Sequence, residues 1–252
     1  MDCIEGPGRF RRVMVVSAHP DDPEFGYGAV VARFVEAGAD VHYVVCTDGS
    51  QGGEDSSISD AELTATRYAE QRRAAAFLGV KGVVFLGFRD GRLTPDVALR
   101  QAVAREIRRL RPDLVLTHLP MRVLSAPISH PDHQAVGEAT LAAIDEDAGA
   151  ARRPPGPASD APPPHVVREV WLPGLDETDH YVDVTTTVDR QVKAVLCHRS
   201  QFVAPGGGVG ATGWAPERLA MVAAMRARMR ALGERSGRGY QFATRVRRLT
   251  IA

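Results

Sequence analysis

Short apolar runs alternate with longer segments of helical periodicity over the first 148 residues. Four runs, each bounded by Gly, Pro or charged residues, are typical of buried strands: 11–18, 40–47, 82–88 and 113–118. Between and after them, apolar residues recur at helical spacing, which predicts helices over 28–39, 58–80, 94–112 and 134–148. Strands that alternate with helices in this way indicate a mostly parallel sheet with helices on both faces. We therefore predict an α/β fold of Rossmann-like architecture.

Capping residues set the expected ends of these helices. Asp60 is the expected N-cap of the second helix, and Gly79 lies near its end, where glycine commonly closes a helix. Thr94 and Pro95 are expected to open the third helix, and Pro112 ends it because its ring cannot continue the hydrogen-bonded turn.

The chain is less regular after residue 148. A Pro-rich stretch at 149–165 predicts an insertion or linker, and a Gly-rich stretch at 204–214 predicts a flexible loop. The remaining pattern predicts two strands and two helices: 166–174, 180–185, 188–201 and 215–237. No internal repeat is found. We predict one domain over 1–252, with a core at about 12–148, the Pro-rich insertion and a small C-terminal cap at 166–252.

Composition narrows the range of partners. The chain has 31 basic and 31 acidic residues, which argues against nucleic acid or an anionic membrane as the main partner. No apolar stretch is long enough to span a bilayer, and the N-terminus lacks the apolar core of a signal peptide. Cys3, Cys46 and Cys197 are scattered and make a poor disulfide framework. We therefore expect a cytoplasmic protein that acts on a small molecule, and a homo-oligomer is compatible with the sequence.

Two short motifs place His and Asp side by side directly after predicted strands. "HPDD" (19–22) follows the first strand, and "HPDH" (130–133) lies in the connection after the fourth. In open parallel sheets, sites form beyond the carboxyl ends of the strands, so both motifs are expected at one edge. Zinc is commonly held by imidazole and carboxylate, and a catalytic zinc keeps three protein ligands and one open position. Each motif alone is more typical of a Pro-stiffened turn, but the pair favours a metal site.

A nucleotide-binding protein on the same architecture is the main rival from another class. It predicts G-x-G-x-x-G after the first strand, whereas this chain has "AHPDDPEFGYGA", which places acids where a diphosphate would be repelled. A non-catalytic sugar- or nucleotide-binding protein that kept only the fold is a further alternative. It is expected to have lost a metal ligand, and both motifs are intact here.

The segment "VVSAHPDDPEFGYGA" (15–29), followed by "SHPDHQAVGEA" (129–139), resembles the LmbE/PIG-L deacetylase family. These are zinc-dependent amidohydrolases that remove acyl groups from amino sugars and their conjugates. The blocks "RYAEQRRAAAFLGV", "FLGFRDGRL" and "VDVTTTVDRQVKAVLCHRSQ" resemble later family blocks in the same order. The resemblance covers most of 12–202, although Ser129 stands where the family often has Gly.

The resemblance implies a catalytic metal site. It assigns His19, Asp22 and His133 as the metal ligands, and Asp21 as the general base that deprotonates the attacking water. The implied cofactor is Zn²⁺, and Fe²⁺, Co²⁺ or Mn²⁺ are compatible with two His and one carboxylate. The implied activity is hydrolysis of the N-acetyl group of an N-acetylglucosaminyl conjugate, such as a thiol-cofactor precursor or a natural-product intermediate. An amidase that cleaves thiol-conjugate amides with the same metal site is the alternative.

The resemblance also implies roles around the metal. His130 would act as the acid that stabilises the oxyanion or protonates the leaving amine, and Asp132 would orient a histidine. Four further residues match positions near the substrate: Arg67, Asp90, Glu24 and His198. From the residues alone, Arg67 and Asp90 are equally consistent with a helix-surface Arg and a turn Asp. Glu24 is equally consistent with a residue that orients a histidine or the loop and with a solvated carboxylate, and a lone helical His such as His198 is more often a packed structural residue. His118 ends a strand at the same edge, and no role is assigned to it.

Overall fold

The computed structural model describes the following residues: 7–53, 57–121, 130–151, 162–175, 179–202 and 215–251. Seven strands are found in this part of the chain: β1 (Arg12–Ser17), β2 (Asp40–Thr47), β3 (Gly82–Phe88), β4 (Leu114–Leu116), β5 (Glu169–Pro173), β6 (His180–Asp183) and β7 (Ala243–Thr250). The main helices are α1 (Asp22–Glu36), α2 (Asp60–Leu78), α3 (Val97–Leu110), α4 (Pro131–Ala142), α5 (Val188–Val195) and α6 (Pro216–Arg235). Three short helical segments accompany them: η1 (Pro7–Arg9), the π-helix η2 (Ala143–Ala148) and η3 (Arg199–Gln201).

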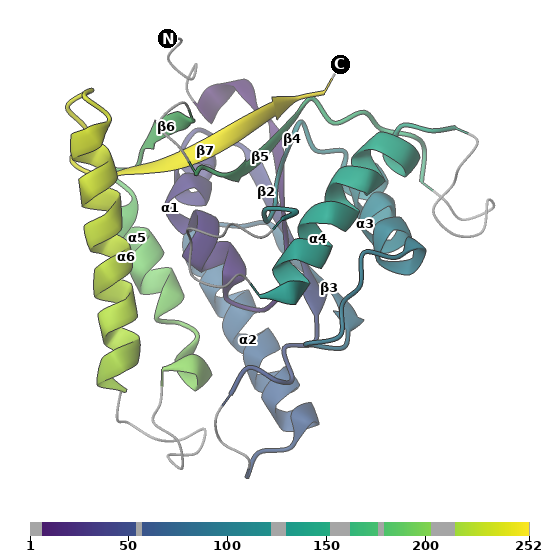
Figure 1. Ribbon diagram of the computed structural model, residues 1–252, viewed down its shortest axis with the longest axis horizontal. Helices are drawn as coiled ribbons and strands as arrows, with labels where there is room; N and C mark the ends of the chain where they lie inside the picture. The colour runs from purple at the N-terminus through teal and green to yellow at the C-terminus, as the bar shows by residue number, and fades with distance from the viewer. Residues whose placement is uncertain are drawn as a thin grey trace.

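The strands form one sheet in the order β3-β2-β1-β4-β5-β7-β6 (Figure 1). The first five strands in this order pair in parallel, while β7 pairs antiparallel with both β5 and β6. The chain runs from β1 outward through β2 to β3 and then returns to place β4 on the other side of β1. That reversal of strand order opens a crevice at the carboxyl ends of β1 and β4, which is where such sheets bind ligands.

Alternate residues of β1 enter two separate cores. Val13 and Val15 pack with α1 and α2, and Met14 and Val16 pack with α3 and α4 on the opposite face. Figure 1 shows these helix pairs on the two sides of the sheet, with α5 and α6 on the side of α1. A strand buried on both faces reads as a continuous apolar run, which is why β1 shows no polar alternation. The predicted α/β fold with a mostly parallel sheet is confirmed.

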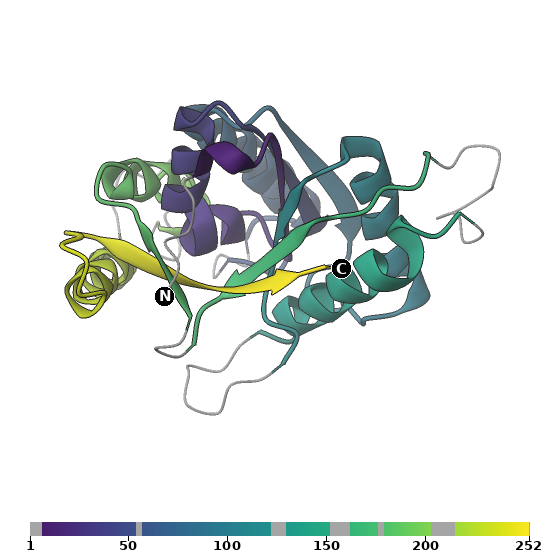
Figure 2. The same ribbon diagram turned by 90° about the horizontal axis from the view of Figure 1, so that it is seen from above.

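The last segment of the chain forms β7, a strand that the apolar pattern does not predict. Figure 2 shows β7 running along β5 toward the C-terminus. Its sequence, ATRVRRLT, hides the strand because three arginines interrupt the apolar pattern. Carboxylates compensate two of these charges: Asp179 lies 2.9 Å from Arg247, and Glu169 lies 2.7 Å from Arg248. Arg245 donates a hydrogen bond to the Leu175 carbonyl.

Several helices begin earlier or later than predicted. α1 begins at Asp22 rather than at 28, because Pro23 and the acids Asp22 and Glu24 suit a first helical turn although two glycines obscure the period. α2 is capped by Ser59 rather than Asp60: the Ser59 side chain accepts from the Glu62 N–H, and the Glu62 carboxylate accepts from the Ser59 N–H.

The other differences concern α3, α4 and α5. α3 begins at Val97 with Asp96 as its N-cap, two residues beyond Pro95. α4 begins at Pro131 rather than at 134, and α5 ends at Val195 rather than at 201. The Gly-rich stretch at 204–214 and most of the Pro-rich stretch at 149–165 lie outside the described residues. No helix in the described part of the chain is both long and apolar enough to cross a membrane.

Helix α4 lies directly against the segment that leaves β4. A Cβ atom added at Gly137 would meet the His118 carbonyl oxygen at 2.5 Å and the Leu119 carbonyl carbon at 2.9 Å. Only glycine fits this contact, which sets the distance between "HPDH" at the start of α4 and the end of β4.

We expect Gly137→Ala to lower the free energy of unfolding by about 1–3 kcal/mol, because the new methyl group would push α4 away from backbone atoms that cannot yield. Gly26→Ala in α1 is the matched control, since a Cβ there meets nothing within 4 Å. The control should raise the stability by up to about 1 kcal/mol through helix propensity. Urea denaturation of both variants measures the difference, and equal stabilities would contradict the close contact.

Candidate metal centre

The first motif forms a tight turn between β1 and α1. The Asp22 carboxylate accepts the backbone N–H of His19 at 2.7 Å, and the His19 carbonyl accepts the N–H of Asp22 at 3.3 Å. Between them, Asp21 has φ 104°, a backbone conformation that non-glycine residues rarely adopt. The turn therefore fixes the Asp22 side chain next to the His19 ring.

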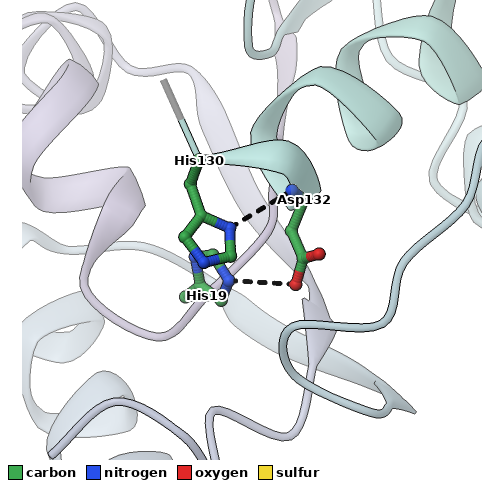
Figure 3. A group of neighbouring side chains, drawn as sticks. All are labelled: His19, His130 and Asp132. Carbon is green, nitrogen blue, oxygen red and sulfur yellow. Dashed lines mark hydrogen bonds and ion pairs between the residues drawn. The ribbon is translucent and has the colours of Figure 1, made fainter. Parts of the chain in front are cut away.

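The second motif opens α4. His130 is the N-cap, and its Nδ1 accepts the backbone N–H of Asp132 at 3.2 Å (Figure 3). A ring nitrogen that accepts a hydrogen bond carries no proton, so the proton of neutral His130 lies on Nε2. His130 is exposed, whereas Asp132 is buried beneath it. The His130 ring stands edge-on to the His19 ring, with the ring centroids 4.7 Å apart.

The structure brings the three predicted metal ligands together. Nδ1 of His19 lies 3.2 Å from Oδ2 of Asp22 and 3.3 Å from Nε2 of His133. Nε2 of His133 lies 3.1 Å from Oδ1 of Asp22. Tetrahedral zinc with bonds near 2.0–2.1 Å places its ligand atoms about 3.3 Å apart. The donor set and its spacing therefore fit one divalent ion.

The other nitrogen of His19 faces two buried carboxylates. Nε2 lies 3.2 Å from Oδ1 of Asp90. It also lies 3.3 Å from Oδ2 of Asp132, a contact that Figure 3 shows. Asp132 also accepts the backbone N–H groups of Gly91 at 2.8 Å and Leu93 at 3.2 Å, which fix its orientation. A carboxylate on one imidazole nitrogen holds the proton there and leaves the opposite lone pair free for a metal. Asp90 and Asp132 thus direct Nδ1 of His19 toward Asp22 and His133.

His19, His130 and Asp132 form a second cluster of possible ligands that shares His19 with the first. Nδ1 of His130 accepts the Asp132 N–H, and both Asp132 oxygens accept backbone N–H groups. Asp22 instead uses Oδ2 for the His19 N–H and turns Oδ1 toward Nε2 of His133, so the His19–Asp22–His133 cluster is the better metal site.

Buried carboxylates dominate the electrostatics around His19. Burial opposes a charged imidazole, but Asp22, Asp132 and Asp90 outweigh it and raise the pKa of His19 to about 12. Carboxylates that stabilise a positive charge on this ring would equally stabilise a divalent cation at the same place.

Neighbouring Asp21 and Asp22 differ in their electrostatic environments. Burial alone would raise the pKa of both carboxyl groups. At Asp22 the adjacent His133 and His19 outweigh burial and hold the pKa well below its usual range. At Asp21 burial prevails over the Arg67 guanidinium, and the pKa is raised. A carboxylate that stays ionised suits a metal ligand, and one with a raised pKa suits a proton acceptor near neutral pH.

His118 was left without a role by the sequence, and it lies beside the cluster. Its Nε2 accepts the backbone N–H of Ala18 at 3.1 Å, which joins the ends of β4 and β1. Its ring stacks on that of His133 with centroids 4.1 Å apart and planes at 11°. Burial lowers the pKa of His118, in keeping with a neutral ring that accepts a hydrogen bond. In the sequence, only its position at the end of a predicted strand, at the sheet edge that carries both motifs, pointed to the site.

Arg67, expected near the substrate, lies 3 % exposed between two loops. Its guanidinium donates to the carbonyls of Pro20 at 2.6 Å and Gly49 at 2.8 Å, and lies 3.4 Å from the Asp21 carboxylate. Arg67 therefore ties the loops after β1 and β2 together. Contacts of Arg67 and Asp90 with a substrate remain predictions.

Glu24 and His198 are not at a surface that a substrate can touch. Both are 0 % exposed, and Nε2 of His198 lies 3.0 Å from Oε2 of Glu24. The expectation that they contact the substrate is therefore corrected: they form a buried pair beneath the first turn of α1. For His198, the alternative role of a packed structural histidine is therefore the correct one. Gln71, which the sequence analysis did not single out, joins this pair; its spacing of four from Arg67 places both on one face of α2.

Comparison with known proteins identifies the family. The profile of PIG-L, described as GlcNAc-PI de-N-acetylase, matches residues 14–144. The chain belongs to the PIG-L family. Diacetylchitobiose deacetylase of Thermococcus kodakarensis is 31% identical over 192 residues, covering 76% of this chain and 70% of that protein. A 1D-myo-inositol 2-acetamido-2-deoxy-alpha-D-glucopyranoside deacetylase of Rhodococcus jostii is 29% identical, covering 78% and 84%. The predicted family resemblance is confirmed.

Solved structures of other proteins share this fold. N,N'-diacetylchitobiose deacetylase of Pyrococcus horikoshii has a TM-score of 0.82 at 24% identity and covers 99% of this chain and 88% of its own. The 4-carboxy-2-hydroxymuconate hydratase GalB of Pseudomonas putida has a TM-score of 0.73 at 21% identity, covering 96% and 97%. A deacetylase and a hydratase therefore use this fold, and the reaction must be argued from the site.

We expect His19→Ala, Asp22→Ala and His133→Ala each to lose stoichiometric divalent metal, because each removes one of three converging donors. Asp132→Asn should keep the ion but bind it about 10–100-fold more weakly, since it weakens the partner of His19 Nε2. Elemental analysis and chelator competition measure both effects. His42→Ala in β2, away from the motifs, is the control; metal that survives all three ligand substitutions would disprove the site.

Proposed function

We propose that this PIG-L protein is a zinc-dependent N-deacetylase that hydrolyses the acetamide of an N-acetylglucosamine-type conjugate. The convergence of His19, Asp22 and His133 carries the proposal, because it supplies three ligands and leaves Asp21 and His130 for proton transfer. Named relatives are deacetylases of substrates that contain this sugar. Fe²⁺, Co²⁺ or Mn²⁺ would also suit two imidazoles and a carboxylate.

The bound ion would polarise the acetamide carbonyl and make water a stronger nucleophile at neutral pH. Asp21 accepts the proton of the attacking water, for which its raised pKa is suited. Asp90 and Asp132 keep His19 in one orientation and one tautomer throughout. The Arg67 guanidinium favours the ionised form of Asp21, the form that can act as a base.

His130 is the proposed acid. Because Nδ1 accepts the Asp132 N–H, Nε2 carries the proton that can stabilise the developing oxyanion or pass to the leaving amine. Its exposure lets it meet an incoming substrate, whereas the carboxylates behind His19 are covered. This division separates the base, Asp21, from the acid, His130.

The substrate is a small amino-sugar conjugate. The relatives named for diacetylchitobiose, N-acetyl-alpha-D-glucosaminyl L-malate and the inositol glycoside share a 2-acetamido sugar and differ in what it carries. We infer that the sugar's acetamide is the reacting group, while the attached group is a larger small molecule such as a thiol-cofactor precursor or a natural-product intermediate. Catalysis is proposed in the cytoplasm, with no nucleic-acid or membrane partner.

A panel assay tests this function. The protein loaded with Zn²⁺ is incubated with N,N'-diacetylchitobiose, an N-acetylglucosaminyl malate and an N-acetylglucosaminyl inositol. The products are identified by mass spectrometry. Loss of one acetyl group with release of acetate supports the proposal. Release of an acylated cysteine from a thiol conjugate would support the amidase alternative, and binding of the sugars without turnover would support a non-catalytic protein.

Asp21→Asn should lower kcat by about 10²–10⁴-fold while the metal content stays unchanged, because the amide cannot accept a proton. His130→Ala should also keep the metal and should remove one limb of the pH profile of kcat/KM. Activity that depends on ionised Asp21 falls as the pH drops through the pKa of that group, so the acid limb should vanish in Asp21→Asn. If Asp21→Asn instead loses the metal, Asp21 is a ligand and its role is exchanged with that of Asp22.

A further inference from the structure

Three polar side chains with no solvent exposure lie beneath the turn that carries Asp21. Glu24 belongs to the first turn of α1, Gln71 to α2, and His198 to the segment between α5 and η3, and each is 0 % exposed. Complete burial means that none of them can touch a substrate or the attacking water. Any effect on the reaction must pass through another residue.

The hydrogen bonds of this trio run in one consistent direction. Nε2 of Gln71 donates to both carboxylate oxygens of Glu24 at 3.0 Å, and Nε2 of His198 lies 3.0 Å from Oε2. This leaves Oε1 of Gln71 facing away from Glu24, where it accepts the backbone N–H of Asp21 at 2.8 Å. A carboxylate can only accept, so Glu24 decides which way the Gln71 amide points, and His198 holds Glu24 in place.

Asp21 is the residue that needs this support. Its φ of 104° is a strained conformation for a side chain with a Cβ, and such strain persists only where surrounding contacts hold it. Its carbonyl accepts the N–H groups of Glu24 at 3.0 Å and Phe25 at 3.1 Å in the first turn of α1. The Gln71 amide takes its N–H, so both ends of the strained residue are fixed.

We propose that the His198–Glu24–Gln71 chain positions Asp21, and that these three are positioning residues for the base of the reaction. The inference rests on the proposed function through the role of Asp21. Burying two ionisable groups and an amide is costly unless each is well paired, and apolar side chains of similar volume often serve stability as well. The directional bonds to a strained backbone give the trio a purpose that packing alone would not require.

Gln71→Met and His198→Met remove the hydrogen bonds at nearly constant volume, and His198→Gln keeps a donor near the position of Nε2. We expect Gln71→Met to lower kcat about 100-fold, because a shift of about 1 Å in a reacting group has that effect. KM and metal content should stay unchanged. His198→Met should lower kcat about tenfold, and His198→Gln should recover most of it. Diacetylchitobiose, or the panel sugar that turns over fastest, is the substrate.

Glu70→Gln is the matched control. Glu70 precedes Gln71 on α2, and its carboxylate accepts the N–H of Ser200 at 2.8 Å and its hydroxyl at 2.6 Å. Gln at this position removes the charge but keeps an oxygen that can accept from Ser200, and none of the hydrogen bonds among His198, Glu24, Gln71 and Asp21 involves Glu70, so kcat should stay at the wild-type value. An equal loss of kcat in Glu70→Gln and His198→Met would mean that general loosening is responsible, and would overturn the proposal.

The decisive readout is the effect of each substitution in an Asp21→Asn background. If the trio acts through Asp21, Gln71→Met and His198→Met should change the residual kcat hardly at all there. The same fold-loss in both backgrounds would overturn the inference while leaving the proposed function intact. Near-normal activity of Asp21→Asn alone would instead overturn the role of Asp21 and the inference with it. If Gln71→Met does not fold, the two His198 variants give the same test.

Discussion

The Asp22 carboxylate joins two parts of the chain that are more than a hundred residues apart. One oxygen accepts the His19 N–H and lies beside Nδ1 of that ring, and the other faces Nε2 of His133. This contact requires β1 and β4 to lie parallel and adjacent, with their carboxyl ends at the same edge. The absence of a side chain at Gly137 lets α4 approach that edge, so the packing of one helix sets the spacing between the ligands.

Carboxylates placed around a single imidazole divide the chemistry of the site. Asp90 and Asp132 face one nitrogen of His19, and Asp22 faces the other, so the ring has one orientation and one free lone pair. Asp21 lies next to Asp22 in sequence but is separated from it in character, because histidines surround one and burial governs the other. The hydratase with the same fold shows that the scaffold alone does not choose a reaction. The side chains around His19 determine which reaction the site can catalyse.

Local patterns in the sequence were sufficient to predict the strands near the site. β2 and β3 have the predicted bounds because their apolar runs are unbroken, and the two motifs follow strands as expected. Burial of polar residues could not be read in this way: a buried Glu24 or His198 looks the same in the sequence as a solvated one. β7 was missed because two of its three arginines are neutralised by carboxylates distant in the chain. Gln71 carried only a helical spacing, and its partners Asp21 and Glu24 lie 50 and 47 residues away at the start of α1.

Anomalous diffraction at the zinc edge, from crystals of the protein loaded with Zn²⁺, tests the central claim most directly. The account predicts one peak per chain, bound by Nδ1 of His19, a carboxylate oxygen of Asp22 and Nε2 of His133, with zinc–nitrogen bonds of about 2.0–2.1 Å. Nε2 of His19 should remain on Asp90 and Asp132. A peak bound by Nε2 of His19 together with His130 and Asp132 would contradict the account, because the orienting carboxylate would then be a ligand.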